Sequence, residues 1–163
     1  MILVTVGSSH FPFDRLLRAV DLLPRSEELV VQHGPSEIRP AGARCMSFAP
    51  LDSLAELVRD ARVVVTHAGV GSILLALSNG KKPVVVPRLR ELGEAVDDHQ
   101  LECARRFSRD DLVTLVEDPA QLAAVVESLD GAALAGRRQE DVPLVRELRL
   151  YIRDAVGAAG AGA

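Results

Sequence analysis

A chain of 163 residues has the length of one domain with a single hydrophobic core. Apolar residues make up 48% of it and charged residues 26%, which excludes disordered and fibrous classes. The net charge of −4 and the 3% aromatic content argue against nucleic-acid binding, which needs a positive surface and bases stacked on rings.

The sequence shows no pattern typical of export, of a membrane span or of a disulfide scaffold. The apolar opening, residues 1–6, has no basic flank and stops at a Gly-Ser-Ser sequence, short of a signal peptide's core. No uncharged stretch approaches the roughly 20 residues that span a bilayer. Cys45 and Cys103 lie far apart and have no metal-binding spacing. We therefore expect a protein of the reducing cytoplasm without a metal site.

Short β-branched runs alternate with amphipathic segments along the chain, which is the pattern of strands joined by crossover helices. Six strands with right-handed crossovers predict an α/β protein with a single Rossmann-like, doubly wound parallel sheet. In chain order the predicted elements are strand 2–6, helix 13–23, strand 28–32, strand 44–48, helix 51–59, strand 62–66, helix 72–78, strand 83–86, helix 97–107, strand 112–116 and helix 119–129.

Several residues mark the ends of these elements. Pro24 is predicted to end the first helix, and Gly80 stands where the end of a helix favours a positive φ. After Gly131 the chain becomes rich in Ala, Gly and Arg. We therefore predict a domain over residues 1–130, followed by a linker, a last helix and a flexible tail over 131–163. The apolar stripe of that last helix either closes this domain's core or packs on a partner or an anionic lipid surface.

Three stretches rich in polar residues and glycine follow predicted strands, at residues 7–10, 67–72 and 93–100. Ligands of an open parallel sheet bind outside the carboxyl ends of its strands. The three stretches are therefore predicted to line one cleft.

The second stretch contains Gly69 and Gly71, whose missing Cβ atoms would let backbone N–H groups approach a phosphate at a helix start. The alternative is that these glycines only make a tight turn between strand and helix. A dinucleotide site is disfavoured, because Leu74 stands where the third glycine of that fingerprint belongs and strand 28–32 ends in Gln32 rather than an acid.

The third stretch gathers Glu94, Asp97, Asp98, His99 and Gln100. These donors and acceptors suit the hydroxyl groups of a sugar. The alternative is that an aspartate caps a helix and that the next two residues are solvated. A histidine in the first stretch, at position 10, is likewise either functional or an ordinary loop residue.

These motifs, in this order and spacing, resemble the C-terminal-domain proteins of glycosyltransferase family 28. The matching segments read VTVGSSH (4–10), PFDRL (12–16), HAGVGS (67–72), GKKPVVVPR (80–88) and GEAVDDHQL (93–101), so the resemblance covers roughly residues 1–129. The last two segments resemble a bacterial subgroup from exopolysaccharide and capsule synthesis, which includes glucuronosyl- and galactosyltransferase subunits. The small catalytic subunit of the N-glycan UDP-GlcNAc transferase is also similar. The resemblance implies the donor-binding C-terminal half of a GT-B enzyme.

The resemblance also implies roles for single residues. The first stretch would lie against the diphosphate or the acceptor. His10 is the best local candidate for the catalytic base, and a residue of a partner is the alternative. The second stretch would surround the ribose and the phosphates, and His99 and Gln100 of the third would face the donor sugar. The family often has a Glu that binds ribose where Leu75 stands here, and Glu94 is our proposed substitute. The full candidate binding set is Gly7, Ser8, Ser9, His67, Ala68, Gly69, Val70, Gly71, Ser72, Glu94, Asp98, His99 and Gln100.

The implied activity is that of a metal-independent, cofactor-free, inverting hexosyltransferase in exopolysaccharide or capsule synthesis. It would move a hexose or hexuronic acid from a UDP-sugar to a lipid-linked glycan. Because the chain supplies only the donor half, a membrane-anchored acceptor-binding subunit is implied, which would recruit it to the inner face of the plasma membrane. The alternatives are a non-catalytic nucleotide-sugar-binding or activating subunit, and a different nucleotide-binding α/β enzyme.

Overall fold

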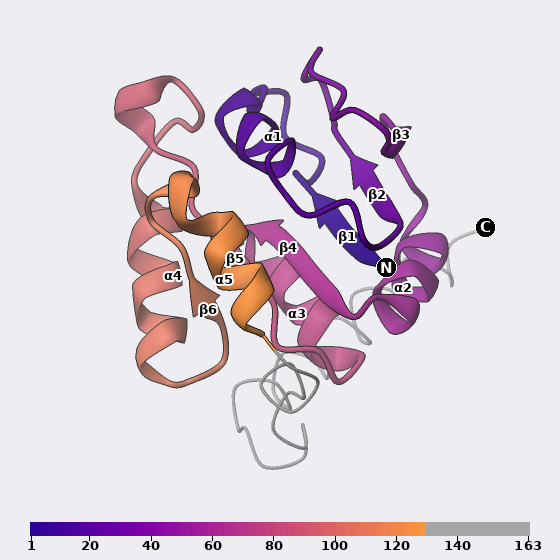
Figure 1. The fold of residues 1–163 in the computed structure, drawn as a ribbon. Coiled ribbons are helices and arrows are strands. Elements are labelled where there is room, and N and C mark those ends of the chain that lie inside the picture. The colour runs from indigo at the N-terminus through magenta and orange to yellow at the C-terminus, as the bar shows by residue number, and fades with distance from the viewer. Residues whose placement is uncertain (130–163) are drawn as a thin grey trace, which may run out of the picture.

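The computed structural model describes residues 1–129, which fold around a six-stranded sheet with helices on both faces (Figure 1). Each neighbouring pair of strands runs parallel, which confirms the predicted doubly wound α/β fold. The predicted linker, last helix and tail lie outside the described residues. The elements are β1 (Ile2–Thr5), α1 (Asp14–Val20), β2 (Leu29–Gln32), β3 (Arg44–Met46), α2 (Leu51–Asp60), β4 (Val63–His67), α3 (Val70–Ser78), β5 (Val84–Val86), η1 (Arg90–Leu92), α4 (His99–Arg109), β6 (Thr114–Leu115), η2 (Pro119–Gln121) and α5 (Leu122–Ser128).

The strand order is β3-β2-β1-β4-β5-β6, so the direction of winding reverses between β1 and β4. Thr5, the last residue of β1, pairs with Gln32 of β2 on one side and with Thr66 of β4 on the other. In such a sheet the loops on either side of the reversal leave in opposite directions and open a crevice. The loops after β1 and β4 therefore flank the place where this fold binds ligands.

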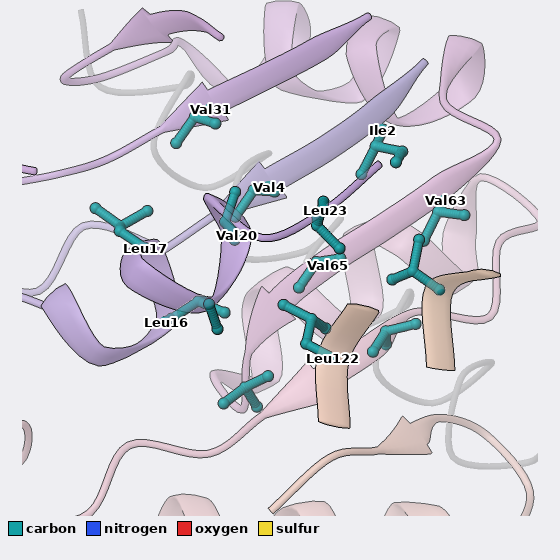
Figure 2. Close-up of a cluster of buried hydrophobic side chains, with 14 of the residues drawn as sticks. Ile2, Val4, Leu16, Leu17, Val20, Leu23, Val31, Val63, Val65 and Leu122 are labelled. Carbon is teal, nitrogen blue, oxygen red and sulfur yellow. The ribbon is translucent and has the colours of Figure 1, made fainter. Parts of the chain in front are cut away.

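Helices α1 and α5 cover one face of the sheet (Figure 2). Leu16 and Leu17 of α1 and Leu122 of α5 are fully buried against Val4 and Val65 of the central strands. Burying one such side chain contributes roughly 1.5–3 kcal/mol. This layer fixes the start of α1, and with it the end of the loop that follows β1.

Helices α2, α3 and α4 cover the opposite face. Leu3 of β1 packs with Val58 of α2 and Ala76 of α3, while Val85 of β5 packs with Phe107 of α4. Because both faces of the strands are buried, the strands are apolar at nearly every position and do not alternate with polar residues. This explains why the strands are continuous apolar runs in the sequence.

The helix boundaries differ from the predicted ones at the carboxyl edge of the sheet. Helix α3 begins at Val70, two residues earlier than predicted, because Gly69 is extended and its carbonyl accepts hydrogen bonds from the N–H groups of Ser72 and Ile73. Gly71 therefore lies inside the first helical turn. The first helix ends at Val20, before the predicted stop at Pro24, and the helix predicted over 119–129 begins as the 3-10 turn η2. Gly80 has the predicted positive φ, +75°.

Candidate functional site

The three sequence-predicted stretches all follow strands at the carboxyl edge of the sheet. The first leaves β1, the second begins at the last residue of β4, and the third runs from the loop after β5 into the first turn of α4. The first two meet directly at the reversal of strand order, through the ring of His67. The side chain of Arg88 joins the third stretch to Phe11, next to the first. The three stretches therefore lie at one edge, but they do not line one cleft as predicted, since no residue of the third lines the cavity that residues of the first two share.

The imidazole ring of His67 is packed between two glycines. A Cβ atom built on Gly69 would lie 2.1 Å from the Nε2 atom of His67, and one built on Gly7 would lie 2.3 Å from its Cε1 atom. Gly7 also has a φ of +77°, which side chains other than glycine rarely adopt. The absence of a side chain at Gly69 is thus explained by the buried ring, which differs from both sequence interpretations of this glycine.

Burial keeps the His67 ring neutral. The side chain is only 8% exposed. Desolvation, with a smaller effect of the Arg88 charge, lowers the pKa of His67 to about 4, although a hydrogen bond with the Thr5 backbone opposes the shift. At neutral pH the His67 ring can donate or accept hydrogen bonds, and it brings no positive charge to a ligand.

The lowered pKa of His67 predicts a loss of stability in acid. Between pH 6.5 and about 4 the unfolded chain binds a proton that the folded chain excludes. The contribution of His67 to the free energy of unfolding is therefore intact above pH 6.5 and is lost as the pH falls to about 4. It amounts to about 3 kcal/mol. Urea unfolding of His67→Asn should show a correspondingly smaller loss between about pH 7 and pH 4. His99→Asn, which removes an 83% exposed side chain, should unfold with the wild-type pH dependence, and equal slopes for all three proteins would refute the assignment.

Gln32 fixes the backbone at the start of the first stretch. Its Oε1 atom accepts hydrogen bonds from the Thr5 hydroxyl at 2.6 Å and from the Gly7 N–H at 3.1 Å. Its Nε2 atom donates to the carbonyls of Gly7, at 3.0 Å, and Ser47, at 2.9 Å. All four hydrogen-bonding positions of this buried amide are thus used. The sequence presented Gln32 only as the residue that replaces a ribose-binding acid, and its role in holding Gly7 was missed.

The start of α3 faces open space. A Cβ atom built on Gly71 would meet nothing within 4 Å, so packing within the described residues does not require glycine there. Val70 and Gly71 are exposed, and Ser72 is partly buried. The first N–H groups of a helix lack partners within it and carry its positive dipole end. This first turn therefore presents N–H groups and an unfilled space to an incoming anion.

A cavity of about 200 Å³ lies beside the start of α3. Its lining combines polar residues of the first and second stretches, together with Thr5 and Gln32, with apolar residues from the start of α2 and the loop before it. Phe48 is 67% exposed and Leu51 is 61% exposed, so a flat ring and an aliphatic side chain stand uncovered at its wall. The lining residues are Thr5, Gly7, Ser8, Gln32, Phe48, Ala49, Leu51, Leu54 and Ser72.

The rest of the first stretch lies at the surface. The Ser9 hydroxyl accepts a hydrogen bond from the Phe11 N–H at 3.3 Å. His10 is exposed, and its ring centroid lies 4.1 Å from that of Phe11. Neither residue lines the cavity beside α3. His10 is thus open to solvent at the carboxyl edge, where an acceptor group from outside the chain could reach it.

The structure disagrees with the expectation that Glu94 binds ribose. Glu94 is 6% exposed and pairs with Arg15, whose Nε donates to Oε1 at 3.0 Å and whose terminal nitrogen donates to Oε2 at 2.8 Å. The Leu89 N–H also donates to Oε2 at 3.0 Å. Glu94 lines a separate cavity of about 640 Å³ between α1, η1 and η2. Its carboxylate thus binds protein groups, and Glu94 does not line the cavity beside α3.

The other polar residues of the third stretch surround the start of α4. Asp97 accepts a hydrogen bond from the His99 N–H at 3.2 Å, and Asp98 accepts one from the Arg90 N–H at 3.4 Å. The Oε1 atom of Gln100 accepts from the Arg88 N–H at 3.3 Å. Asp97 thus accepts the first N–H of α4, whereas the N-cap residue Asp98 makes no side-chain capping bond, so the capping alternative holds only in part. His99 projects into solvent, and the Gln100 amide nitrogen remains available to a ligand.

Two further absences concern the portion of the chain that the structure describes. Within residues 1–129, no three His, Cys, Asp or Glu side chains are grouped so that they could hold a metal ion. No helix within the same residues has the length and apolar character to cross a bilayer.

The family profile described as "Glycosyltransferase family 28 C-terminal domain" matches residues 1–141. Among curated proteins, the UDP-N-acetylglucosamine transferase subunit ALG13 of Yarrowia lipolytica is 33% identical over 125 residues, which cover 67% of this chain and 61% of the relative. The human subunit of the same name is 34% identical over 122 residues, covering 67% of this chain and 10% of the relative. The chain thus spans about three fifths of the first relative and about a tenth of the second.

Solved structures show the same architecture. The calicheamicin glycosyltransferase CalG4 superposes with a TM-score of 0.59 at 20% identity, over 81% of this chain and 35% of that one. The glycotransferase of kitacinnamycin superposes with a TM-score of 0.55 at 22% identity, over 82% and 36%. At these identities the likeness concerns the fold alone, which is that of the Rossmann-like C-terminal domains of GT-B enzymes.

Proposed function

Because this chain belongs to the glycosyltransferase family 28 C-terminal domain family, we propose that it is the donor-binding catalytic subunit of an inverting, metal-independent glycosyltransferase. The donor is a UDP-sugar and the acceptor a lipid-linked glycan. A second, membrane-anchored subunit presents the acceptor and recruits this chain to the inner face of the plasma membrane. No cofactor takes part beyond the co-substrate.

One observation carries the proposal, namely the cavity that Gly7, Ser8 and Ser72 share with an uncovered aromatic ring. A pyrimidine base and a ribose fit a lining that combines apolar side chains with hydroxyl and amide groups. The diphosphate would lie where the open first turn of α3 offers its N–H groups. The names of the two ALG13 relatives add support for a UDP-sugar donor and for a role as a subunit.

The chemistry follows from where negative charge appears. The acceptor hydroxyl attacks the anomeric carbon from the face opposite the diphosphate, the bond to the diphosphate oxygen breaks, and UDP leaves with the charge. N–H groups aimed at that leaving group stabilise the transition state more than the ground state, by a few kcal/mol per well-placed donor. The proton of the hydroxyl passes to a base at the open side of the edge, either His10 or a residue of the partner.

Gly71→Ala should separate ligand binding from stability. Alanine favours a helix over glycine by roughly 0.5–1 kcal/mol, and no protein atom obstructs its Cβ. The free protein should therefore be as stable as the wild type or slightly more so. The added methyl group occupies the space of the diphosphate, so calorimetry should show UDP affinity reduced about tenfold or more, a difference of about 1.4 kcal/mol. Arg106→Ala, at the exposed end of α4, is the control, and unchanged affinity in Gly71→Ala would refute the diphosphate position.

The sugar and the acceptor class are separate parts of the proposal. The motif resemblance favours a hexose or hexuronic acid and exopolysaccharide or capsule synthesis, whereas the ALG13 relatives are named for UDP-N-acetylglucosamine and lend no support to the exopolysaccharide role. A panel of radiolabelled UDP-glucose, UDP-galactose, UDP-glucuronic acid and UDP-GlcNAc, offered to membranes that carry the chain and its partner subunit, decides between them. Transfer of one sugar to lipid extract identifies the donor.

The alternative is a subunit that binds the nucleotide sugar without catalysing transfer. Its support is Leu75, which stands where the family often has a ribose-binding Glu. In the same assay, a non-catalytic subunit predicts unchanged transfer when His10 and Gln100 are both replaced by alanine. The catalytic proposal predicts that transfer falls by about tenfold or more.

A further inference from the structure

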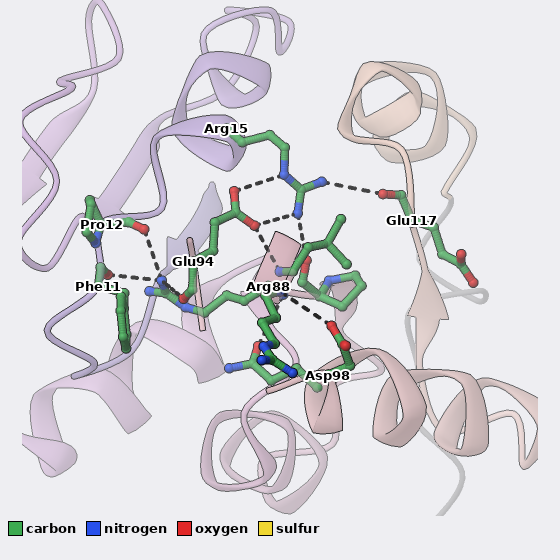
Figure 3. Close-up of polar contacts among 11 residues, drawn as sticks. Phe11, Pro12, Arg15, Arg88, Glu94, Asp98 and Glu117 are labelled. Carbon is green, nitrogen blue, oxygen red and sulfur yellow. Dashed lines mark hydrogen bonds and ion pairs between the residues drawn. The ribbon is translucent and has the colours of Figure 1, made fainter. Parts of the chain in front are cut away.

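Arg88 is the largest fully buried side chain among residues 1–129, with no exposed surface. It follows the apolar strand β5 and reaches back under the loop after β1 (Figure 3). One terminal nitrogen donates hydrogen bonds to the carbonyls of Phe11, at 3.0 Å, Pro12, at 3.1 Å, and Glu94, at 3.1 Å. The other donates to the carbonyl of Val6 at 2.9 Å. A single guanidinium thus binds the residues that flank both ends of the first stretch and one residue of the third.

The main chain of Arg88 extends the same connection. Its N–H donates to the Gln100 side chain, which is the donor-sugar residue implied by the resemblance. A second link runs parallel to it, since Arg15 at the start of α1 binds the Glu94 carboxylate and also donates to the Pro87 carbonyl at 2.8 Å. Hydrogen bonds of Arg88 and Arg15 therefore connect the loop after β1, the loop after β5 and the start of α4.

Burying the charged side chain of Arg88 is an inefficient way to stabilise the fold. The guanidinium is desolvated, which lowers the pKa of Arg88 to about 10, while the Glu94 charge raises it, so the group is charged at neutral pH. Its Nε atom is buried without a hydrogen-bond partner. Its other neighbours are neutral carbonyls and the ring of Phe13, 4.6 Å from the guanidinium carbon. Buried charges are weak sources of stability compared with apolar side chains of similar volume, and their value lies in fixing one geometry.

We propose that Arg88 is a positioning residue for donor binding. It fixes the spacing between residues 7–12 and residues 94–100 so that both can contact one nucleotide sugar, and it does not touch the ligand itself. This inference rests on the proposed function, because it assigns to Arg88 the arrangement of that same site. Its planar fork satisfies four carbonyls at once, whereas a lysine in the same place has three donors on a single nitrogen.

The test compares Arg88→Met, Arg88→Lys and Arg25→Met, where Arg25 makes a half-exposed ion pair with Asp21 and serves as the matched loss of a guanidinium. UDP-sugar affinity is measured by calorimetry, and hydrogen exchange is followed at the amides of residues 7–12 and 94–98. Arg88→Met should weaken UDP-sugar binding about tenfold or more and speed exchange in both loops. Arg88→Lys should fall between Arg88→Met and the wild type, and Arg25→Met should match the wild type.

Chemical rescue separates positioning from a general loss of structure. In Arg88→Ala, added methylguanidinium should refill the space and restore both the slow exchange of the loops and the affinity. Recovery of the melting temperature without recovery of affinity overturns the proposal, and so does wild-type affinity in a folded Arg88→Met. If Arg88→Met does not fold, Arg88→Lys and Arg15→Met, which loosens the parallel link, carry the same comparison.

Failure of the proposed function gives a different result. A wild-type chain that binds no uridine nucleotide refutes the function, while the exchange rates of residues 7–12 and 94–98 still report whether Arg88 holds the two loops. Exchange rates unchanged by Arg88→Met would then overturn the inference on its own.

Discussion

Gly69→Ala should lower the free energy of unfolding by about 2–3 kcal/mol, the cost of overpacking a well-filled interior. The new Cβ would lie 2.1 Å from the Nε2 atom of His67. The ring has little room to move, because Gly7 lies against the adjacent Cε1 atom. Urea unfolding of the variant and the wild type at neutral pH measures the difference.

Gly71→Ala is the matched control for this experiment, since it is the same substitution two residues away with nothing within 4 Å of the new Cβ. It should leave stability equal or slightly higher. His67→Ala should remove the clash, so the double variant His67→Ala/Gly69→Ala should be less destabilised than the two single losses added together. If the two losses simply add, the His67 ring is not packed closely against Gly69.

Gln32→Leu is expected to be about as damaging as Gly69→Ala, at about 2–3 kcal/mol, because it removes the four hydrogen bonds of a buried amide. The Gly7 carbonyl would lose this donor and the Thr5 hydroxyl this acceptor, whereas the Ser47 carbonyl would keep the Gly34 N–H and the Gly7 N–H would keep the Thr5 hydroxyl. Freed from this clamp, Gly7 would leave its positive-φ conformation more readily. We therefore expect UDP affinity to fall together with stability, measured by calorimetry and urea unfolding.

Gln32→Glu refines this prediction. The carboxylate keeps both acceptor contacts, but it turns a negative oxygen toward the carbonyls of Gly7 and Ser47 in place of a donor. The Gln32→Glu protein should therefore be clearly less stable than the wild type at neutral pH. Gln121→Leu, the same change as Gln32→Leu at an exposed position of η2, is the control. Equal stability of Gln32→Leu and Gln121→Leu would show that the clamp contributes nothing.

The fold was predictable because its signal is local and repeated. Runs such as the Val-rich strands β4 and β5 are buried on both faces, so hydrophobicity alone reveals them. The order of strands and helices then allows few arrangements of a parallel sheet. Helix ends were less predictable. The helix predicted over 72–78 begins at Val70, because the carbonyl of Gly69, two residues before Gly71, accepts its first hydrogen bonds.

The placement of the candidate stretches was predictable, and the contacts of their residues were less so. The stretches at 7–10 and 67–72 meet as expected, because both follow central strands. Glu94 seemed free because its partner, Arg15, lies 79 residues away in the sequence. Gln32 and Arg88 were missed for the same reason, since their partners come from several loops. The sequence did contain one indication of their roles, since each is a polar residue at or just after the end of a buried apolar strand. A polar side chain buried there needs hydrogen-bond partners, and only the fold shows which residues these are.

The central claim is that a uridine diphosphate binds at the reversal of strand order, between the Gly7–Ser8 backbone and the first turn of α3. A titration of the isotope-labelled chain with UDP, followed by the backbone amide resonances, tests it most directly. We expect the largest shifts at Ser8, Val70, Gly71 and Ser72, with far smaller shifts when ADP replaces UDP. Largest shifts around the separate cavity of α1 and η2, or equal responses to UDP and ADP, would contradict the claim.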